Sequence, residues 1–159
     1  MKIEEKYDVI VVGGGHAGCE AALSAARMGS RVLMLNLYLD NIAMMPCNPS
    51  IGGPAKGHLV REIDALGGEM AKAADNATHH LRWLNTSKGA AVRALRAQCS
   101  PRAYSDHYRT ALLTEKNLEL HQGQASELII ENGAAVGIKL KTGQKFFGGC
   151  VVLATGTYL

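Results

Sequence analysis

A glycine-rich turn that directly follows an apolar run constrains this 159-residue chain more than any other feature. Residues 7–18 read YDVIVVGGGHAG, which places Gly13, Gly15 and Gly18 in the spacing G-x-G-x-x-G. In such a turn the first glycine permits a tight bend, the second lets the backbone approach a pyrophosphate, and the third lets a helix pack closely on a sheet. The motif therefore predicts a nucleotide-binding site.

The residues around the turn supply the structural context that this motif requires. Apolar residues predict a strand over 7–12 and a second strand over 31–37, and the small residues between them predict a helix over 16–28. A strand, a glycine turn, a helix and a strand in this order form a parallel unit with a right-handed crossover. The free N–H groups and the positive dipole end at the start of the helix attract phosphates.

Composition limits the class of protein. The formal net charge is +3 and the hydrophobic fraction is 47%, as in an ordinary soluble domain with at most a mild preference for anionic partners. None of the cysteines forms a C-x-x-C pair, which disfavours a zinc site or a disulfide framework and favours reduced thiols in the cytoplasm. The charged N-terminus and the short strand after it do not resemble a signal or membrane segment, so we expect a cytoplasmic protein with no bound metal.

The rest of the chain reads as further helices and strands after a long irregular stretch at 38–57. Asn132-Gly133 predicts a tight hairpin turn. We expect helices over 58–66, 69–75 and 101–115, and strands over 118–121, 125–131, 135–141, 145–147 and from residue 151. The chain stops just after an apolar strand and the sequence Ala-Thr-Gly, which suggests that residues 1–159 are the N-terminal portion of a longer protein.

This order of elements resembles the FAD domain of the glutathione-reductase type. The resemblance implies an α/β fold, with a Rossmann-like parallel sheet and a three-stranded antiparallel β-meander, and it favours FAD over NAD. It also implies that Thr155 and Gly156 approach the dinucleotide. One position departs from the fingerprint: the acidic residue expected at the end of the second strand is replaced by Asn36, which can still hydrogen-bond a ribose hydroxyl but carries no charge.

Several further blocks narrow the resemblance. Residues 14–22 read GGHAGCEAA, residues 46–53 read PCNPSIGG, residues 56–68 read KGHLVREIDALGG, and residues 85–89 read NTSKG. Together they closely resemble the N-terminal part of the tRNA uridine 5-carboxymethylaminomethyl modification flavoproteins, the MnmG or GidA family, over nearly the whole chain. Ala90, in place of a proline, and Cys99-Ser100, in place of Ala-Asp, are mild departures that leave the glycine turn intact.

The resemblance implies a specific activity. Proteins of this family act with a partner GTPase of the MnmE type on the wobble uridine of tRNA. They use FAD, NADH as reductant and methylenetetrahydrofolate to build a carboxymethylaminomethyl-type group at the 5-position of uracil, and the full-length proteins form homodimers. By position, the resemblance and the motif together imply a cofactor site made of Gly13, Gly14, Gly15, His16, Ala17, Gly18, Asn36, Ala125, Thr155 and Gly156.

Two groups of residues outside the glycine turn are candidates for chemistry on RNA. Cys47 lies between prolines in a glycine-rich loop. It is either a packed thiol, a proton shuttle, or a nucleophile that activates uracil at its 6-position, and the family context favours function. The basic residues Lys88, Arg93 and Arg96 are either a solvated polar face or contacts to tRNA phosphates.

Two alternatives to the tRNA-modifying enzyme remain open. One is a general FAD-dependent oxidoreductase acting on a small molecule. The other is a nucleotide-binding fragment without catalytic activity of its own, since part of an FAD site is expected beyond residue 159. Colour tests the purely structural reading, because a bound flavin absorbs visible light. Binding of tRNA by the full-length protein separates the tRNA-modifying enzyme from a small-molecule oxidoreductase.

Overall fold

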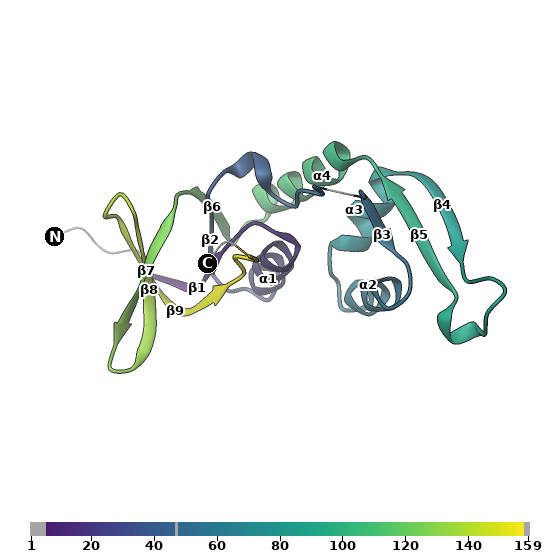
Figure 1. Cartoon of the computed structure of the whole chain (residues 1–159). Coiled ribbons are helices and arrows are strands. Elements are labelled where there is room, and N and C mark those ends of the chain that lie inside the picture. The colour runs from purple at the N-terminus through teal and green to yellow at the C-terminus, as the bar shows by residue number, and fades with distance from the viewer. Residues whose placement is uncertain (1–5, 47, 158–159) are drawn as a thin grey trace. The chain divides into compact units, whose positions relative to one another are not determined.

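The computed structural model describes residues 6–46 and 48–157, which form two compact units (Figure 1). The first unit comprises the chain up to Ile42 together with the chain from Ala111 onward, and the second comprises Ala43–Thr110. Cys47 lies outside the described residues.

The first unit is a mixed six-stranded sheet with the strand order β6-β2-β1-β9-β8-β7. Its elements are β1 (Lys6–Val12), α1 (His16–Arg27), β2 (Val32–Asn36), the short 3-10 helix η1 (Leu39–Asn41), β6 (Leu118–Gln122), β7 (Ala125–Glu131), β8 (Ala134–Leu140) and β9 (Lys145–Leu153). Strands β6, β2, β1 and β9 pair in parallel, so their carboxyl ends lie at one edge of the sheet. The predicted α/β fold with a parallel sheet is confirmed.

Strands β7, β8 and β9 form the predicted three-stranded antiparallel meander. The turn between β7 and β8 has φ of 50° at Asn132 and 80° at Gly133. Two successive positive φ angles match the two-residue hairpin turn that an Asn-Gly pair favours. The hairpin prediction is therefore confirmed.

The prediction that 145–147 and the final strand from residue 151 are separate elements was wrong. They form one strand, β9. Its residues 145–147 pair antiparallel to β8, and its residues 147–153 pair in parallel to β1. Gly148 and Gly149 do not break the strand, because both pack closely against β1. A Cβ on Gly148 would lie 2.9 Å from Ile10 Cγ1, and a Cβ on Gly149 would lie 3.0 Å from the Asp8 carbonyl oxygen. These glycines permit close strand contact rather than a turn.

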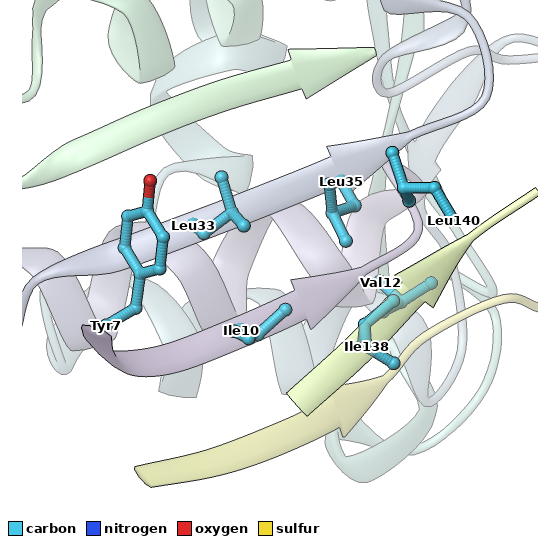
Figure 2. Packing of buried hydrophobic residues seen from close by; sticks show 7 residues of the cluster. All are labelled: Tyr7, Ile10, Val12, Leu33, Leu35, Ile138 and Leu140. Atoms are coloured by element: carbon cyan, nitrogen blue, oxygen red, sulfur yellow. The ribbon is translucent and has the colours of Figure 1, made fainter. Parts of the chain in front are cut away.

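The core of the first unit lies between the parallel strands and the meander (Figure 2). The seven buried side chains drawn there are Tyr7, Ile10, Val12, Leu33, Leu35, Ile138 and Leu140. Val32 and Met34, which alternate with Leu33 and Leu35 along β2, are buried as well. Burial of both faces of a strand is typical of a parallel sheet that is covered on both sides.

The second unit contains an antiparallel sheet with the strand order β3-β5-β4. Its elements are β3 (Ser50–Gly52), α2 (Lys56–Ala65), α3 (Met70–Ala77), β4 (Thr78–Leu84), the 3-10 helix η2 (Ala90–Val92), β5 (Ala94–Cys99) and most of α4 (Pro101–Thr114). Helices α2 and α3 lie on one side of this sheet (Figure 1). The sequence predicted the three helices, whereas β3 and β5 fall in stretches expected to be irregular or merely polar.

A buried carboxylate connects α4 to the start of α3. Glu69 Oε1 lies 2.8 Å from His107 Nε2, and the Asn76 side-chain amide lies 3.3 Å from His107 Nδ1. Because an amide nitrogen only donates, this arrangement leaves the ring proton on Nε2, which donates to Glu69. Lys72 Nζ is more distant, at 3.7 Å from Glu69 Oε2, and its side chain is half exposed. The Glu69–His107 contact is therefore the stronger of the two.

We predict that His107→Ala lowers the free energy of unfolding by about 2 kcal/mol, because it removes a charge-assisted hydrogen bond from a buried carboxylate. Lys72→Ala, which removes only a longer contact from a half-exposed ammonium group, should cost about 0.5 kcal/mol. Urea denaturation followed by circular dichroism measures both values. Equal losses for the two variants would contradict the role assigned to His107.

Candidate dinucleotide site

The glycine turn lies at the carboxyl ends of three parallel strands. The Gly13 N–H donates to the Leu35 carbonyl at the end of β2 (2.8 Å), and the Ala154 N–H donates to the Val12 carbonyl at the end of β1 (2.8 Å). The Cys19 N–H donates to the Gly15 carbonyl (2.9 Å), which closes the first turn of α1. The turn is thus held by backbone bonds to the strands on both sides of β1. Ligands of open parallel sheets bind at such an edge.

Two glycines are required by crowding. Gly13 has a φ of +111°, and a Cβ there would lie 2.3 Å from the Ala154 carbonyl oxygen. A Cβ on Gly18 would lie 1.8 Å from the Gly13 carbonyl oxygen. Both distances are far below van der Waals contact, so a side chain at either position would force the backbone apart. The roles predicted for Gly13 and Gly18 from the sequence agree with this packing.

Gly15 differs from both, because a Cβ built on it meets nothing within 4 Å. Gly15 is the N-cap residue of α1, no side chain caps the helix, and its first turn holds no acidic residue. Ala17, in that first turn, is exposed, and His16 is half-buried. The start of α1 therefore borders open space at Gly15, and no acidic side chain lies in its first turn. This is the arrangement that binds an anionic group such as a pyrophosphate.

Asn36 supports the glycine turn from the end of β2. Its Oδ1 accepts a hydrogen bond from the Gly14 N–H (2.9 Å), and its Nδ2 donates to the Tyr38 carbonyl (2.7 Å). A Cβ on Gly14 would lie 2.6 Å from the same Nδ2. The sequence predicted a contact from Asn36 to a ribose hydroxyl, which stays a prediction. The hydrogen bond to Gly14 is a role that the sequence did not reveal, because it joins residues 22 positions apart.

Two further segments reach the same edge of the sheet. The Gly123 N–H donates to the Asn36 carbonyl (2.9 Å), which places the turn before Ala125 next to the end of β2. On the other side, the Thr155 nitrogen lies 3.1 Å from the Cβ position of Gly13. Gly156 follows with a φ of +65°. The structure therefore brings together all of the cofactor residues predicted from the sequence, although they come from four separate segments.

The other predicted residues belong to the second unit. Lys88 and Arg93 are exposed in the loop between β4 and β5, where Arg93 Nε donates to the Lys88 carbonyl (3.2 Å). Arg96 lies within β5 and donates from Nε to Ser50 Oγ (3.1 Å). Of the three predicted basic residues, Lys88 and Arg93 thus lie together in a loop, and Arg96 lies in a strand.

Three negative findings concern the described residues. Within residues 6–46 and 48–157, no group of three His, Cys, Asp or Glu side chains could hold a metal ion. Over the same residues, no helix has the length and apolar character needed to cross a membrane. Cys19, Cys99 and Cys150, the described cysteines, are free thiols.

We predict that Gly18→Ala mainly lowers the stability of the fold, whereas Gly15→Ala mainly weakens the binding of FAD. Gly18→Ala should lower the free energy of unfolding by about 1–3 kcal/mol, because its methyl group meets the Gly13 carbonyl. Gly15→Ala should change stability by less than about 1 kcal/mol. It should nevertheless weaken FAD binding about tenfold or more, because its methyl group enters the space left for the pyrophosphate. Thermal unfolding and titration with FAD measure these effects, and a Gly15→Ala variant with unchanged affinity would contradict the assignment.

Comparisons with known proteins agree with this geometry. Residues 8–159 match the family described as Glucose inhibited division protein A. The tRNA uridine 5-carboxymethylaminomethyl modification enzyme MnmG of Desulfitobacterium hafniense is 58% identical over 153 residues, covering 96% of this chain and 24% of its own length. The chain thus spans about a quarter of the length of the curated relatives it matches.

Solved structures give the same result. The structure of Aquifex aeolicus GidA is 44% identical, with a TM-score of 0.94, over 99% of this chain and 26% of that one. The GidA-related protein from Thermus thermophilus is 25% identical, with a TM-score of 0.67, over 96% of this chain and 54% of that one. The glycine turn, the fold and these similarities show that the chain belongs to the Glucose inhibited division protein A family.

Proposed function

We propose that the chain is the FAD-binding N-terminal portion of a flavoenzyme that modifies the wobble uridine of tRNA. The observation that carries the proposal is the open space at Gly15, at the start of α1, in a turn that backbone hydrogen bonds hold at the ends of β1, β2 and β9. Family membership adds the substrate class, since relatives of the chain are named as tRNA uridine modification enzymes.

The residues of the first unit fit an FAD molecule along the edge of the sheet. The turn from Gly13 to Gly18 holds the pyrophosphate through backbone N–H groups at the start of α1, and the backbone at Ala125 contacts the adenine side. Asn36 keeps the turn in shape through Gly14 and binds a ribose hydroxyl, while Thr155 and Gly156 approach the dinucleotide from β9. When bound, the flavin supplies the redox chemistry that a polypeptide lacks.

The rest of the activity follows from the family. The complete enzyme is cytoplasmic and works as a homodimer with a partner GTPase of the MnmE type. NADH reduces the flavin, and methylenetetrahydrofolate supplies the one-carbon unit of the carboxymethylaminomethyl-type group. Lys88, Arg93 and Arg96 contact tRNA phosphates in this proposal, since guanidinium and ammonium groups neutralise the nucleic-acid backbone.

Cys47 is proposed to prepare uracil for this reaction. Addition of its thiolate to the 6-position makes the 5-position nucleophilic. After the new bond forms at the 5-position, a base removes the proton there and the thiolate leaves from the 6-position, which restores the ring. The alternative for the same residue is proton transfer within the site.

Flavin retention by the purified chain tests the proposal. We expect a visible absorbance band of oxidised flavin after reconstitution with FAD, and release of intact FAD on denaturation, detected by mass spectrometry. A small-molecule oxidoreductase would share this result but would not bind tRNA, and a purely structural domain would show neither property. A chain and a full-length enzyme that both fold and both stay colourless at saturating FAD would contradict the proposal.

We predict that Cys47→Ser, introduced into the full-length enzyme, retains FAD but loses uridine modification by about 10²-fold or more, because a hydroxyl is a much weaker nucleophile than a thiolate. Nucleoside chromatography of tRNA measures the loss. Cys150→Ser is the matched control, since it changes an exposed free thiol of the first unit. Wild-type turnover by Cys47→Ser would rule out both chemical roles.

A further inference from the structure

One face of the sheet in the second unit carries polar and cationic side chains in two adjacent rows across its strands. The first row is Ser50, Gln98 and His80, and the second row is Gly52, Arg96 and Arg82. Residues directly opposite one another, and residues two apart along a strand, share a face of the sheet. Four of these side chains, His80, Arg82, Arg96 and Gln98, line a shallow pocket of about 270 Å³. We call these four residues the cationic face.

On β3 and β5, the opposite face of the same sheet belongs to the core of the unit, whereas Leu81 and Trp83 on β4 are exposed there. Ile51 and Ala97, which face each other across β3 and β5, are buried. Cys99 Sγ lies 3.9 Å from the Ala74 carbonyl oxygen, which places α3 on this side. The cationic face is therefore the side of the sheet that α3 leaves uncovered, and His80 and Arg82 are exposed there.

The charges on the cationic face are not balanced within the described part of the chain. Arg82 and Arg96 are direct cross-strand partners, and no carboxylate of residues 6–46 or 48–157 forms an ion pair with either. Like charges directly opposite each other destabilise a sheet. Ser50 contacts two cationic side chains: its hydroxyl accepts a hydrogen bond from Arg96 Nε (3.1 Å), and its carbonyl accepts one from Lys56 Nζ (3.2 Å). These two bonds orient the Arg96 side chain and place the Lys56 ammonium group next to Ser50.

We infer that the cationic face binds a phosphodiester of the RNA backbone between Arg82 and Arg96. Each guanidinium offers a planar set of donors that matches phosphate oxygens, and one phosphate placed between them relieves their mutual repulsion. Gln98 and His80, one row away, can donate to or accept from the ribose hydroxyl next to that phosphate. The inference rests on the proposed function for the identity of the RNA, and it adds Arg82, His80 and Gln98, which the sequence did not single out.

Binding of an unmodified tRNA transcript to the 159-residue chain, followed by fluorescence anisotropy over a series of NaCl concentrations, tests this inference. The Arg82→Gln/Arg96→Gln variant should bind about tenfold more weakly at low salt, and the slope of log K against log salt should fall by about 0.7–0.9, the value of one phosphate contact. Arg61→Gln is the matched control, because it removes one exposed charge from α2 rather than from either strand. It should leave the slope unchanged.

Thermal unfolding of the same proteins separates binding from a structural role. Relief of the repulsion between Arg82 and Arg96 should leave the melting temperature unchanged or raise it. An unchanged slope in the double variant, an equal loss in Arg61→Gln, or equal competition by polyglutamate would overturn the inference. Flavin content is measured separately on each preparation, so the expected salt slopes in a colourless chain would support the RNA contact, while the proposed cofactor is tested by the flavin content of the full-length enzyme.

Discussion

The close approach of three backbone segments at the carboxyl edge of the parallel sheet is the constraint on which the first unit depends. The Gly13 carbonyl oxygen lies 1.8 Å from the position that a Cβ of Gly18 would take, and the Ala154 carbonyl oxygen lies 2.3 Å from the position that a Cβ of Gly13 would take. Because these glycines have no side chain, α1 can begin right after β1, and β9 can pair with every part of β1 from Lys6 to Val12.

Much of the first unit could be predicted from the sequence because its signals are local. The apolar runs at β1 and β2, the spacing of the glycines and the Asn132-Gly133 turn each specify a conformation within a few residues. The continuity of β9 could not be predicted in this way. Gly148-Gly149 reads as a break, and only the crowding against Ile10 and Asp8 shows why the strand continues.

The cofactor site was predicted as a set of residues, but not as a set of interactions. Asn36 was expected to act on the ligand, and in the structure its side chain also bonds to Gly14 of the turn. In the second unit Arg96 was predicted from its charge, whereas its neighbour Arg82 emerges only from strand register. Register depends on pairing between segments far apart in sequence, for which a single sequence carries little signal. The two units thus hold different parts of the proposed function: a dinucleotide edge in one and a cationic face in the other.

A crystal structure of the chain in complex with FAD tests the central claim most directly. The account predicts that the pyrophosphate oxygens lie within hydrogen-bond distance of backbone N–H groups at the start of α1, in front of Gly15, with the adenine towards Ala125. A diphosphate bound elsewhere, or a turn that must unfold from β1 to admit it, would contradict the account.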